Sequence, residues 1–205
     1  DGNVTTMGRA SSDYSALLIG SILGADEILI MSDVDGIMTT DPKMVSEAEV
    51  VDSLSYLEAT EMSHFGAEVL NPKTLEPAME QNIPVRVKNA FSPEKKGTLI
   101  VKKSEKVRKV VKAVTTTMKV SIVTVGGPSM IGTSGVAAEV LKTLEEAGIK
   151  VLMISQSSSQ TNISFAVQRE RLTETLEVLR REFEDRHVDW RIEFDEKASI
   201  VAVVG

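Results

Sequence analysis

The sequence has no cysteine and few aromatic residues. Among its 205 residues there is no Cys, and Phe, Trp and Tyr together make up 4%. Without Cys the chain forms no disulfide and offers no thiolate to zinc, which is typical of proteins in a reducing compartment. The core must therefore be built from Val, Ile, Leu, Ala and Met, within an ordinary apolar content of 42%.

Long apolar runs and an excess of positive charge are absent as well. No stretch approaches the roughly 18 apolar residues that a membrane-spanning helix needs, and the first residues do not resemble a signal peptide. The net charge of −7 argues against non-specific binding to nucleic acid. We therefore expect a cytoplasmic protein without membrane or nucleic-acid partners, built as one large domain or two small ones.

Residues 28–43, ILIMSDVDGIMTTDPK, form the most informative stretch. The apolar run Ile28–Met31 predicts a strand buried on both faces, and a loop rich in Asp and Thr follows it. Ligands of open α/β sheets gather at the carboxyl ends of strands, and acidic, hydroxyl-bearing loops there suit a nucleotide with Mg²⁺. The alternative is an ordinary surface turn, because Asp and Gly are common in turns.

A polar segment with one arginine precedes this stretch. Residues 5–14, TTMGRASSDY, lead into an apolar helical segment that Gly24 ends. Ser12 and Asp13 occupy positions expected of a helix N-cap, and Arg9 lies just before them. The loop and the helix start are therefore suited to an anion or an amino-acid zwitterion.

The following residues alternate between helix and strand. Helices are expected over residues 56–65 and 72–81, strands over 84–88 and 98–101, and a loop over 89–97. This alternation predicts a mostly parallel sheet covered by helices. Residues 102–112, KKSEKVRKVVK, are rich in Lys and Arg; a solvated linker between domains explains them better than a phosphate-binding patch.

A second region shows the order βαββαβ of a ferredoxin-like unit. Strands are expected over 119–125, 149–154, 161–167 and 188–194, with helices from Val136 to Gly148 and over 172–183. Its glycine-rich loop, GGPSMIGTSG, does not have the spacing of a dinucleotide-binding loop. Residues 199–205 repeat residues 121–127 at five of seven positions, which predicts the start of a second unit, an added strand, or pairing with another chain.

Taken together, these segments resemble a known family. TTMGRASSDYSA, SDVDGIMTTDPK, EATEMSHFGAEVLNP and IPVRVKNAFSPEKKGTL are similar to the C-terminal half of the kinase domain of aspartate kinases, in the amino acid kinase family. SQSSSQTN, at residues 155–162, resembles a loop of their ACT domains. The resemblance implies an α/β kinase half with helices on both faces of its sheet (1–101), a linker (102–112), an ACT domain (113–197) and the first strand of a second ACT unit (198–205).

The resemblance also implies an activity. Aspartate kinases use ATP with Mg²⁺ to convert aspartate into 4-phospho-L-aspartate, the first step toward lysine, threonine and methionine. By this resemblance Arg9 and Asp13 are catalytic and bind aspartate together with Ser12, and no metal site is formed by the protein alone. The residues expected at the nucleotide are Ser32, Asp33, Met38, Lys43, Lys88 and Asn89.

Four positions depart from the usual family pattern, and these departures put efficient ATP binding in question. Ala10 and Ser11 stand where glycines are usual, Met38 where Tyr is usual, and Glu68 where some members have Lys.

The ACT resemblance implies control by an amino acid. Threonine or lysine is the expected effector, and the chain is expected to form a homodimer or larger homo-oligomer through its ACT domains. The effector residues implied are Met130, Ile131, Gly132, Gln156 and Asn162. Nothing before residue 5 matches the phosphate loop of these kinases, so the alternative is a non-catalytic fragment that senses an amino acid and dimerises through ACT strands.

Overall fold

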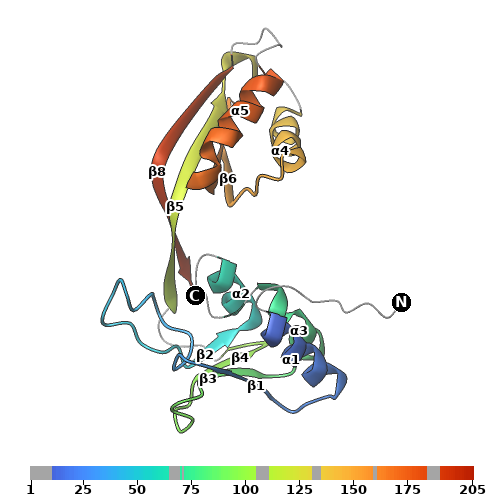
Figure 1. The fold of residues 1–205 in the computed structure, drawn as a ribbon, viewed down its shortest axis with the longest axis vertical. Coiled ribbons are helices and arrows are strands. Elements are labelled where there is room, and N and C mark those ends of the chain that lie inside the picture. Colours follow the sequence, from blue (N-terminus) through green and yellow to red (C-terminus); the bar gives the residue numbers. More distant parts are fainter. Residues whose placement is uncertain are drawn as a thin grey trace. The chain divides into compact units, whose positions relative to one another are not determined.

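The computed structural model describes residues 11–64, 70, 72–104, 111–130, 135–158, 161–183 and 190–205. The chain divides into two compact units (Figure 1). The first contains Asp1–Thr116 together with Val201–Gly205, and the second contains Thr117–Ile200. In sequence, the second unit is therefore inserted between two parts of the first. Within the described residues, no helix has the length and apolar character needed to cross a membrane.

The first unit is built on a four-stranded sheet in the order β1-β3-β4-β2. Strands β1 (Ile28–Ser32) and β3 (Val85–Asn89) pair in parallel, as do β2 (Ser53–Ser55) and β4 (Thr98–Val101). Strands β3 and β4 are antiparallel, because a short loop joins them and a parallel pair would need a longer crossover. The expectation of a mostly parallel sheet is confirmed.

The helices of the first unit pack against one another and against the sheet. They are α1 (Ser11–Ile22), α2 (Tyr56–His64), the 3-10 helix η1 (Pro72–Leu75) and α3 (Glu76–Gln81). Helix α3 is followed by the C-cap residue Asn82, whose φ of 57° is left-handed. One apolar core lies between these helices and the sheet.

The expectation that β1 is buried on both faces is wrong. Ile28 and Ile30 are buried, whereas Leu29 is 50% and Met31 is 47% exposed. The reason is that the described helices all lie over the same face of the sheet (Figure 1). Helices on both faces are accordingly not found among the residues that the structure describes.

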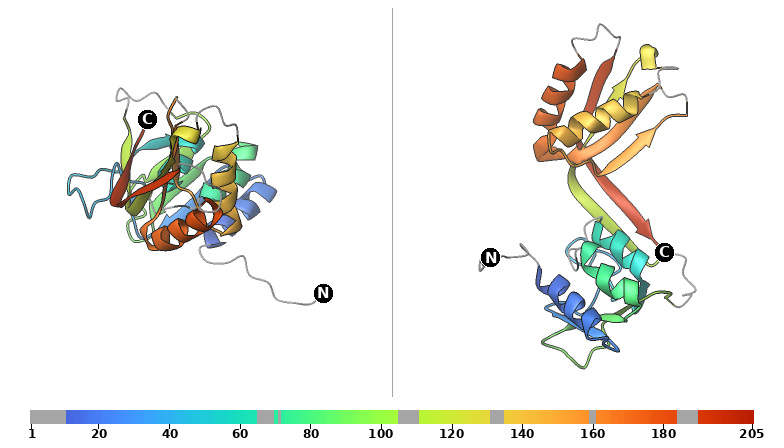
Figure 2. Two further views of the ribbon diagram at one scale, coloured as in Figure 1. Left: turned by 90° about the horizontal axis from the view of Figure 1, so that it is seen from above. Right: turned by 90° about the vertical axis from the view of Figure 1, so that its right-hand side faces the viewer.

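The second unit has the expected order βαββαβ. Its strands are β5 (Ala113–Gly126), β6 (Met153–Gln156), β7 (Asn162–Gln168) and β8 (Arg191–Val204), in the sheet order β6-β7-β5-β8. Helices α4 (Val136–Glu146) and α5 (Leu172–Phe183) cover one face of this sheet (Figure 2), and the short 3-10 helices η2 (Pro128–Met130) and η3 (Arg169–Arg171) lie in its connections. The apolar stripes of both helices form the core with β5 and β7, as predicted.

Strand β8 is longer than the sequence suggested. Two strands were expected, over 188–194 and from residue 198 on, but β8 runs without interruption from Arg191 to Val204. It pairs along β5, which begins at Ala113. At the far end of this pair, the backbone N–H of Lys112 donates to the carbonyl of Val204 at 2.8 Å. Residues 198–205 thus add to an existing strand pair, and a second repeat remains a prediction.

Candidate functional site

The carboxyl ends of β1 and β3 bring four of the predicted nucleotide residues together. In the parallel register, Met31 is opposite Lys88 and Ser32 is opposite Asn89. Asp33 follows directly, and its Oδ1 accepts a hydrogen bond of 3.3 Å from the Ser32 hydroxyl. This edge of the sheet is where ligands of α/β folds bind.

Asp35 ties the loop after β1 to the loop after β3. Its Oδ1 accepts from Asn89 Nδ2 at 2.7 Å, and its Oδ2 accepts from Lys95 Nζ at 2.6 Å. The hydrogen bond from Lys95, followed by that from Asn89, lowers the pKa of Asp35, and the same bond to Asp35 raises the pKa of Lys95. The N–H of Phe91 donates to Asn89 Oδ1, and that of Ala90 donates to the carbonyl of Ser32. We call Asp35, Asn89 and Lys95 the Asp35 cluster.

Two members of the Asp35 cluster were missed as site residues in the sequence. Asp35 was visible as one of several loop carboxylates, but nothing marked it above the others. Lys95 lies 60 residues further along the chain, and no local spacing connects the two. Lys88 was expected at the nucleotide, and its Nζ donates to the carbonyl of Pro93 at 2.7 Å.

A glycine fixes the direction in which the loop leaves β1. Gly36 has a φ of +152°, and a Cβ there would lie 2.7 Å from Thr98 Oγ1 and 2.8 Å from Val50 Cγ1. The next residue, Ile37, donates its N–H to Thr98 Oγ1 at 2.8 Å, and Thr98 is fully buried. The loop that presents Asp35 is therefore anchored to β4.

Met38 and Lys43 lie further along the same connection. Met38 and Val50 form an isolated antiparallel β-bridge. Next to it, the N–H of Thr39 donates to the carbonyl of Glu49, and the N–H of Glu49 donates to the hydroxyl of Thr39. Lys43 is exposed, and its N–H donates to Asp41 Oδ1 at 2.8 Å. These bonds give the connection a hairpin-like start, and the structure does not bring Met38 or Lys43 into the Asp35 cluster.

The predicted aspartate-binding residues lie at the start of α1. The helix begins at Ser11, so Ser12 and Asp13 belong to its first turn, and their expected N-cap position is wrong by about one residue. The two side chains contact each other, with Ser12 Oγ donating to Asp13 Oδ1 at 3.4 Å. Helix α1 packs against β1. Arg9, Ala10 and Glu68 lie outside the described residues.

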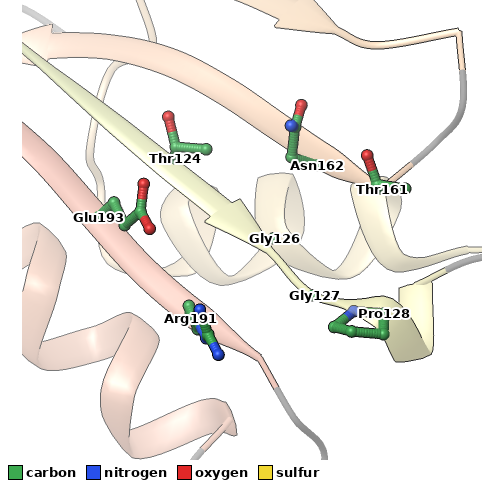
Figure 3. A pocket seen from close by; sticks show the side chains of 8 residues that line it. All are labelled: Thr124, Gly126, Gly127, Pro128, Thr161, Asn162, Arg191 and Glu193. Atoms are coloured by element: carbon green, nitrogen blue, oxygen red, sulfur yellow. The ribbon is translucent and has the colours of Figure 1, made fainter.

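The described residues of the second unit form a cavity of about 430 Å³. Figure 3 shows its lining, which comes from the ends of β5, β7 and β8 and from the corner after β5. The lining residues are Thr124, Gly126, Gly127, Pro128, Thr161, Asn162, Arg191 and Glu193.

Of the predicted effector residues that the structure describes, which are Met130, Gln156 and Asn162, only Asn162 lines this cavity. Met130 is buried in the core, and its N–H already donates to the carbonyl of Gly127 at 3.1 Å. Gln156 is paired opposite Ile163, whose side chain faces the helices, whereas Asn162 is paired opposite Gly126. Residues paired directly across an antiparallel ladder share a face, so Gln156 and Asn162 point to opposite faces. Ile131 and Gly132 lie outside the described residues.

Among the residues that the structure describes, no group of three or more His, Asp or Glu side chains is placed to hold a metal ion. Asp33 and Asp35 both lie in the loop that follows β1, and they do not form a cluster with a third carboxylate or histidine among the described residues. They are suited to holding the waters of a cation that arrives with a nucleotide.

Comparison with known proteins gives a consistent result for both units. Residues 1–89 match the amino acid kinase family, and residues 123–183 match the ACT domain. The bifunctional aspartokinase/homoserine dehydrogenase of Haemophilus influenzae is 40% identical over 100% of this chain and 25% of its own length. The chain thus spans about a quarter of that curated relative.

Solved structures agree with the sequence matches. Aspartokinase III of E. coli in complex with lysine and aspartate has a TM-score of 0.79 at 35% identity, covering 97% of this chain and 44% of that one. The same enzyme in complex with aspartate and ADP has a TM-score of 0.75 at 32% identity, over the same shares of both chains. Residues 1–89 are thus similar to amino acid kinases and residues 123–183 to ACT domains, and aspartokinase III resembles the chain across both parts.

Proposed function

We propose that the chain is part of an aspartate kinase that transfers the γ-phosphoryl group of ATP, bound with Mg²⁺, to the side-chain carboxylate of aspartate. The observation that carries this proposal is the parallel register that places Ser32 opposite Asn89, with Asp33 and Lys88 as their neighbours, at the carboxyl ends of β1 and β3. The solved relative whose description names aspartate and ADP supports the same substrates.

Phosphoryl transfer needs positioned charges more than covalent chemistry. In this proposal, Asp33 and Asp35 hold waters of the Mg²⁺ that accompanies ATP, and Lys43 lies near the phosphates. Asp13 and Ser12 at the start of α1 bind the ammonium of aspartate, while Arg9 stabilises charge on the transferred group. Met38 and Asn89 lie against the nucleotide.

The proposal is tested by ATP-dependent formation of aspartyl hydroxamate. Replacing Asp13 by Ala should lower kcat/KM for aspartate about 100-fold or more, because a positioned charge at the reacting substrate is lost. Asp26→Ala is the matched control, since Asp26 is an exposed carboxylate that precedes β1 at the opposite edge of the sheet. Equal turnover by the Asp13 variant and the parent would contradict the assignment.

We further propose that the second unit binds an amino-acid effector and contributes to a homodimer or larger oligomer in the cytoplasm. The ACT match over residues 123–183 supports this regulatory role. The division into a kinase part (1–101), a linker (102–112), an ACT domain (113–197) and the start of a second ACT unit (198–205) belongs to the same proposal.

The second candidate function is a non-catalytic amino-acid sensor. The cavity of the second unit favours it, because this cavity is formed without any residue of the first unit. Folded protein that binds threonine or lysine but forms no aspartyl hydroxamate would favour the sensor over the kinase.

A further inference from the structure

The loop after β1 contains a hairpin that carries two of the predicted nucleotide residues. It consists of residues 37–51, and two hydrogen bonds between Thr39 and Glu49 join its two sides. Met38 lies next to these bonds, and Lys43 lies in the part of the loop that they close off. We call residues 37–51 the Thr39 hairpin. The positions of Met38 and Lys43 depend on how this hairpin is held.

The backbone carbonyl of Thr39 is held by a segment from a distant part of the sequence. It accepts a hydrogen bond of 2.8 Å from the N–H of Val114, near the beginning of β5. Figure 1 shows the beginning of β5 beside this loop, which is drawn in blue. Both residues belong to the first compact unit, although β2, β3 and β4 lie between them in sequence. The N–H, the hydroxyl and the carbonyl of Thr39 are thus all engaged within the fold.

The residues around Val114 are themselves fixed in the first unit. Ala113 is 2% exposed and belongs to the apolar core of this unit. The N–H of Lys112 donates to the carbonyl of Val204 at 2.8 Å, and its ammonium pairs with Glu58 at 2.8 Å. Because the side chain of Lys112 is only 8% exposed, water competes weakly for this ion pair. The beginning of β5 is therefore a well-anchored support for the hairpin.

The Thr39 hairpin is also attached nearer to β1. There the N–H of Ile37 donates to the hydroxyl of the buried Thr98, which fixes the point where the hairpin starts. The bond from Val114 acts further along, on the side of the hairpin that leads to Lys43. Two points of attachment define an orientation that a single one leaves free.

We propose that residues 112–114 are positioning residues of the nucleotide site, which hold the Thr39 hairpin in the orientation that places Met38 and Lys43 at ATP. This inference rests on the proposed function, from which the hairpin takes its ligand. A loop that is ordered in advance loses less conformational entropy on binding than a free one. Residues 112–114 follow the segment 1–89 that matches the amino acid kinase family, so the inference adds to the site a part of the chain outside that match.

The anchoring of the hairpin and the binding of a nucleotide are linked by thermodynamics. A bond between Val114 and Thr39 that favours nucleotide binding must be stabilised by the nucleotide to the same extent. Amide hydrogen exchange of the parent chain, followed by NMR, tests this directly. ADP with Mg²⁺ should slow the exchange of the Val114 N–H about three- to tenfold, the factor expected of one ordinary hydrogen bond. The N–H of Ile28, which donates to Pro84 before β3, is the control and should exchange at an unchanged rate.

Val114→Pro removes the N–H that donates to Thr39. In the hydroxamate assay it should raise KM for ATP about three- to tenfold, with little change in kcat or in KM for aspartate. A merely structural role would give the opposite pattern, since partial unfolding lowers kcat and leaves KM unchanged. Val111→Pro is the matched control, because it introduces the same ring at an exposed position before β5 begins, and its KM values should equal those of the parent.

The two measurements separate this inference from the kinase assignment. Turnover by the parent, with the same KM for ATP in Val114→Pro and Val111→Pro, would retain the kinase and overturn the positioning role. Exchange at Val114 that ADP leaves unchanged, while calorimetry shows that ADP binds, would overturn the role as well, and this result does not depend on whether the variant folds. A folded parent that neither binds ADP nor forms hydroxamate would overturn the proposed function and the inference with it.

Discussion

At the scale of single residues, the Asp35 cluster determines how the candidate nucleotide site is held. Asp35 receives hydrogen bonds from Asn89, at the end of β3, and from Lys95, in the loop after it. These hydrogen bonds lower the pKa of Asp35. The carboxylate therefore stays ionised at pH values at which an ordinary aspartate already takes up a proton. The cluster therefore joins the two loops at neutral pH without help from a ligand.

Removing the ammonium of Lys95 should loosen this connection. Lys95→Met is expected to raise KM for ATP about two- to fivefold with a smaller change in kcat, because an exposed ion pair contributes only modestly. The measurement is the hydroxamate assay over a range of ATP concentrations. Lys96→Met is the control, as Lys96 is its exposed neighbour, and a similar rise in KM for both variants would contradict a specific role for Lys95.

The sequence predicted where β1 and β3 end better than it predicted the side-chain contacts made at those ends. Ser32, Asp33, Lys88 and Asn89 were assigned to the nucleotide by the family resemblance, and in the structure they lie at or directly after the carboxyl ends of β1 and β3. The ion pair of Asp35 with Lys95 needed the fold, since the chain brings these residues together from positions 60 residues apart. The opposite directions of Gln156 and Asn162 depended on strand register, which a sequence pattern does not supply.

At the scale of elements, the start of α2 is fixed by a capping box. The N–H of Ser55 donates to Glu58 Oε2 at 2.6 Å, and the N–H of Glu58 donates to Ser55 Oγ at 3.2 Å. Glu58 also forms an ion pair of 2.8 Å with Lys112, whose side chain is only 8% exposed. Ser104 donates to Glu58 and accepts from Lys112. The segment just before β5 is thereby attached to α2.

Glu58→Gln should destabilise the first unit and change its response to acid. Burial raises the pKa of Glu58, but hydrogen bonds from Lys112 and from the Ser55 N–H outweigh it, so the pKa falls below its ordinary value of 4.5. The stabilisation is present above pH 4.5 and is lost as the pH falls through the lowered pKa. We expect a loss of about 2 kcal/mol in the free energy of unfolding at pH 7.

Urea unfolding of the parent and the variant at pH 7 and at about pH 3 measures this effect. The difference in free energy of unfolding should shrink at the lower pH, because the parent's carboxylate is then protonated. Glu61→Gln, on the exposed side of the same helix, should cost little at either pH. A constant difference for Glu58→Gln between the two pH values would show that its charge does not matter.

Element boundaries were predicted least well where packing decides them. The sequence analysis expected a strand over 188–194 and treated the end of the chain separately, because residues 199–205 repeat residues 121–127. In the structure β8 continues from one segment into the other, since the ladder with β5 supplies backbone hydrogen bonds that do not depend on side-chain polarity. Ser121 and Arg169 even donate to the carbonyl of Glu196.

At the scale of the whole molecule, the first unit is completed by residues from the end of β8. Val204 is 7% exposed and belongs to the same core as Ile30 and Val85, whereas its neighbour Val203 is 64% exposed. Val204→Asp should therefore destabilise the first unit by about 3 kcal/mol, because a carboxylate enters an apolar core. Val203→Asp should change its stability by less than about 1 kcal/mol.

Hydrogen exchange followed by mass spectrometry distinguishes the two units in this experiment. Peptides from β1 and β3 should lose protection in the Val204 variant, and peptides from α4 and α5 should keep theirs. Equal loss in both units would mean that they do not unfold independently, and protection retained in β1 would mean that Val204 is not part of that core.

The position of Val204 also has a consequence for synthesis on the ribosome. Most of the first unit precedes the second unit in sequence, yet its core includes a side chain that follows the entire second unit. The core of the second unit is formed by residues between Val123 and Ile192, so it depends on no residue made later. The later-made unit is thus able to finish folding first, and the earlier-made one closes only when the ribosome has passed Val204.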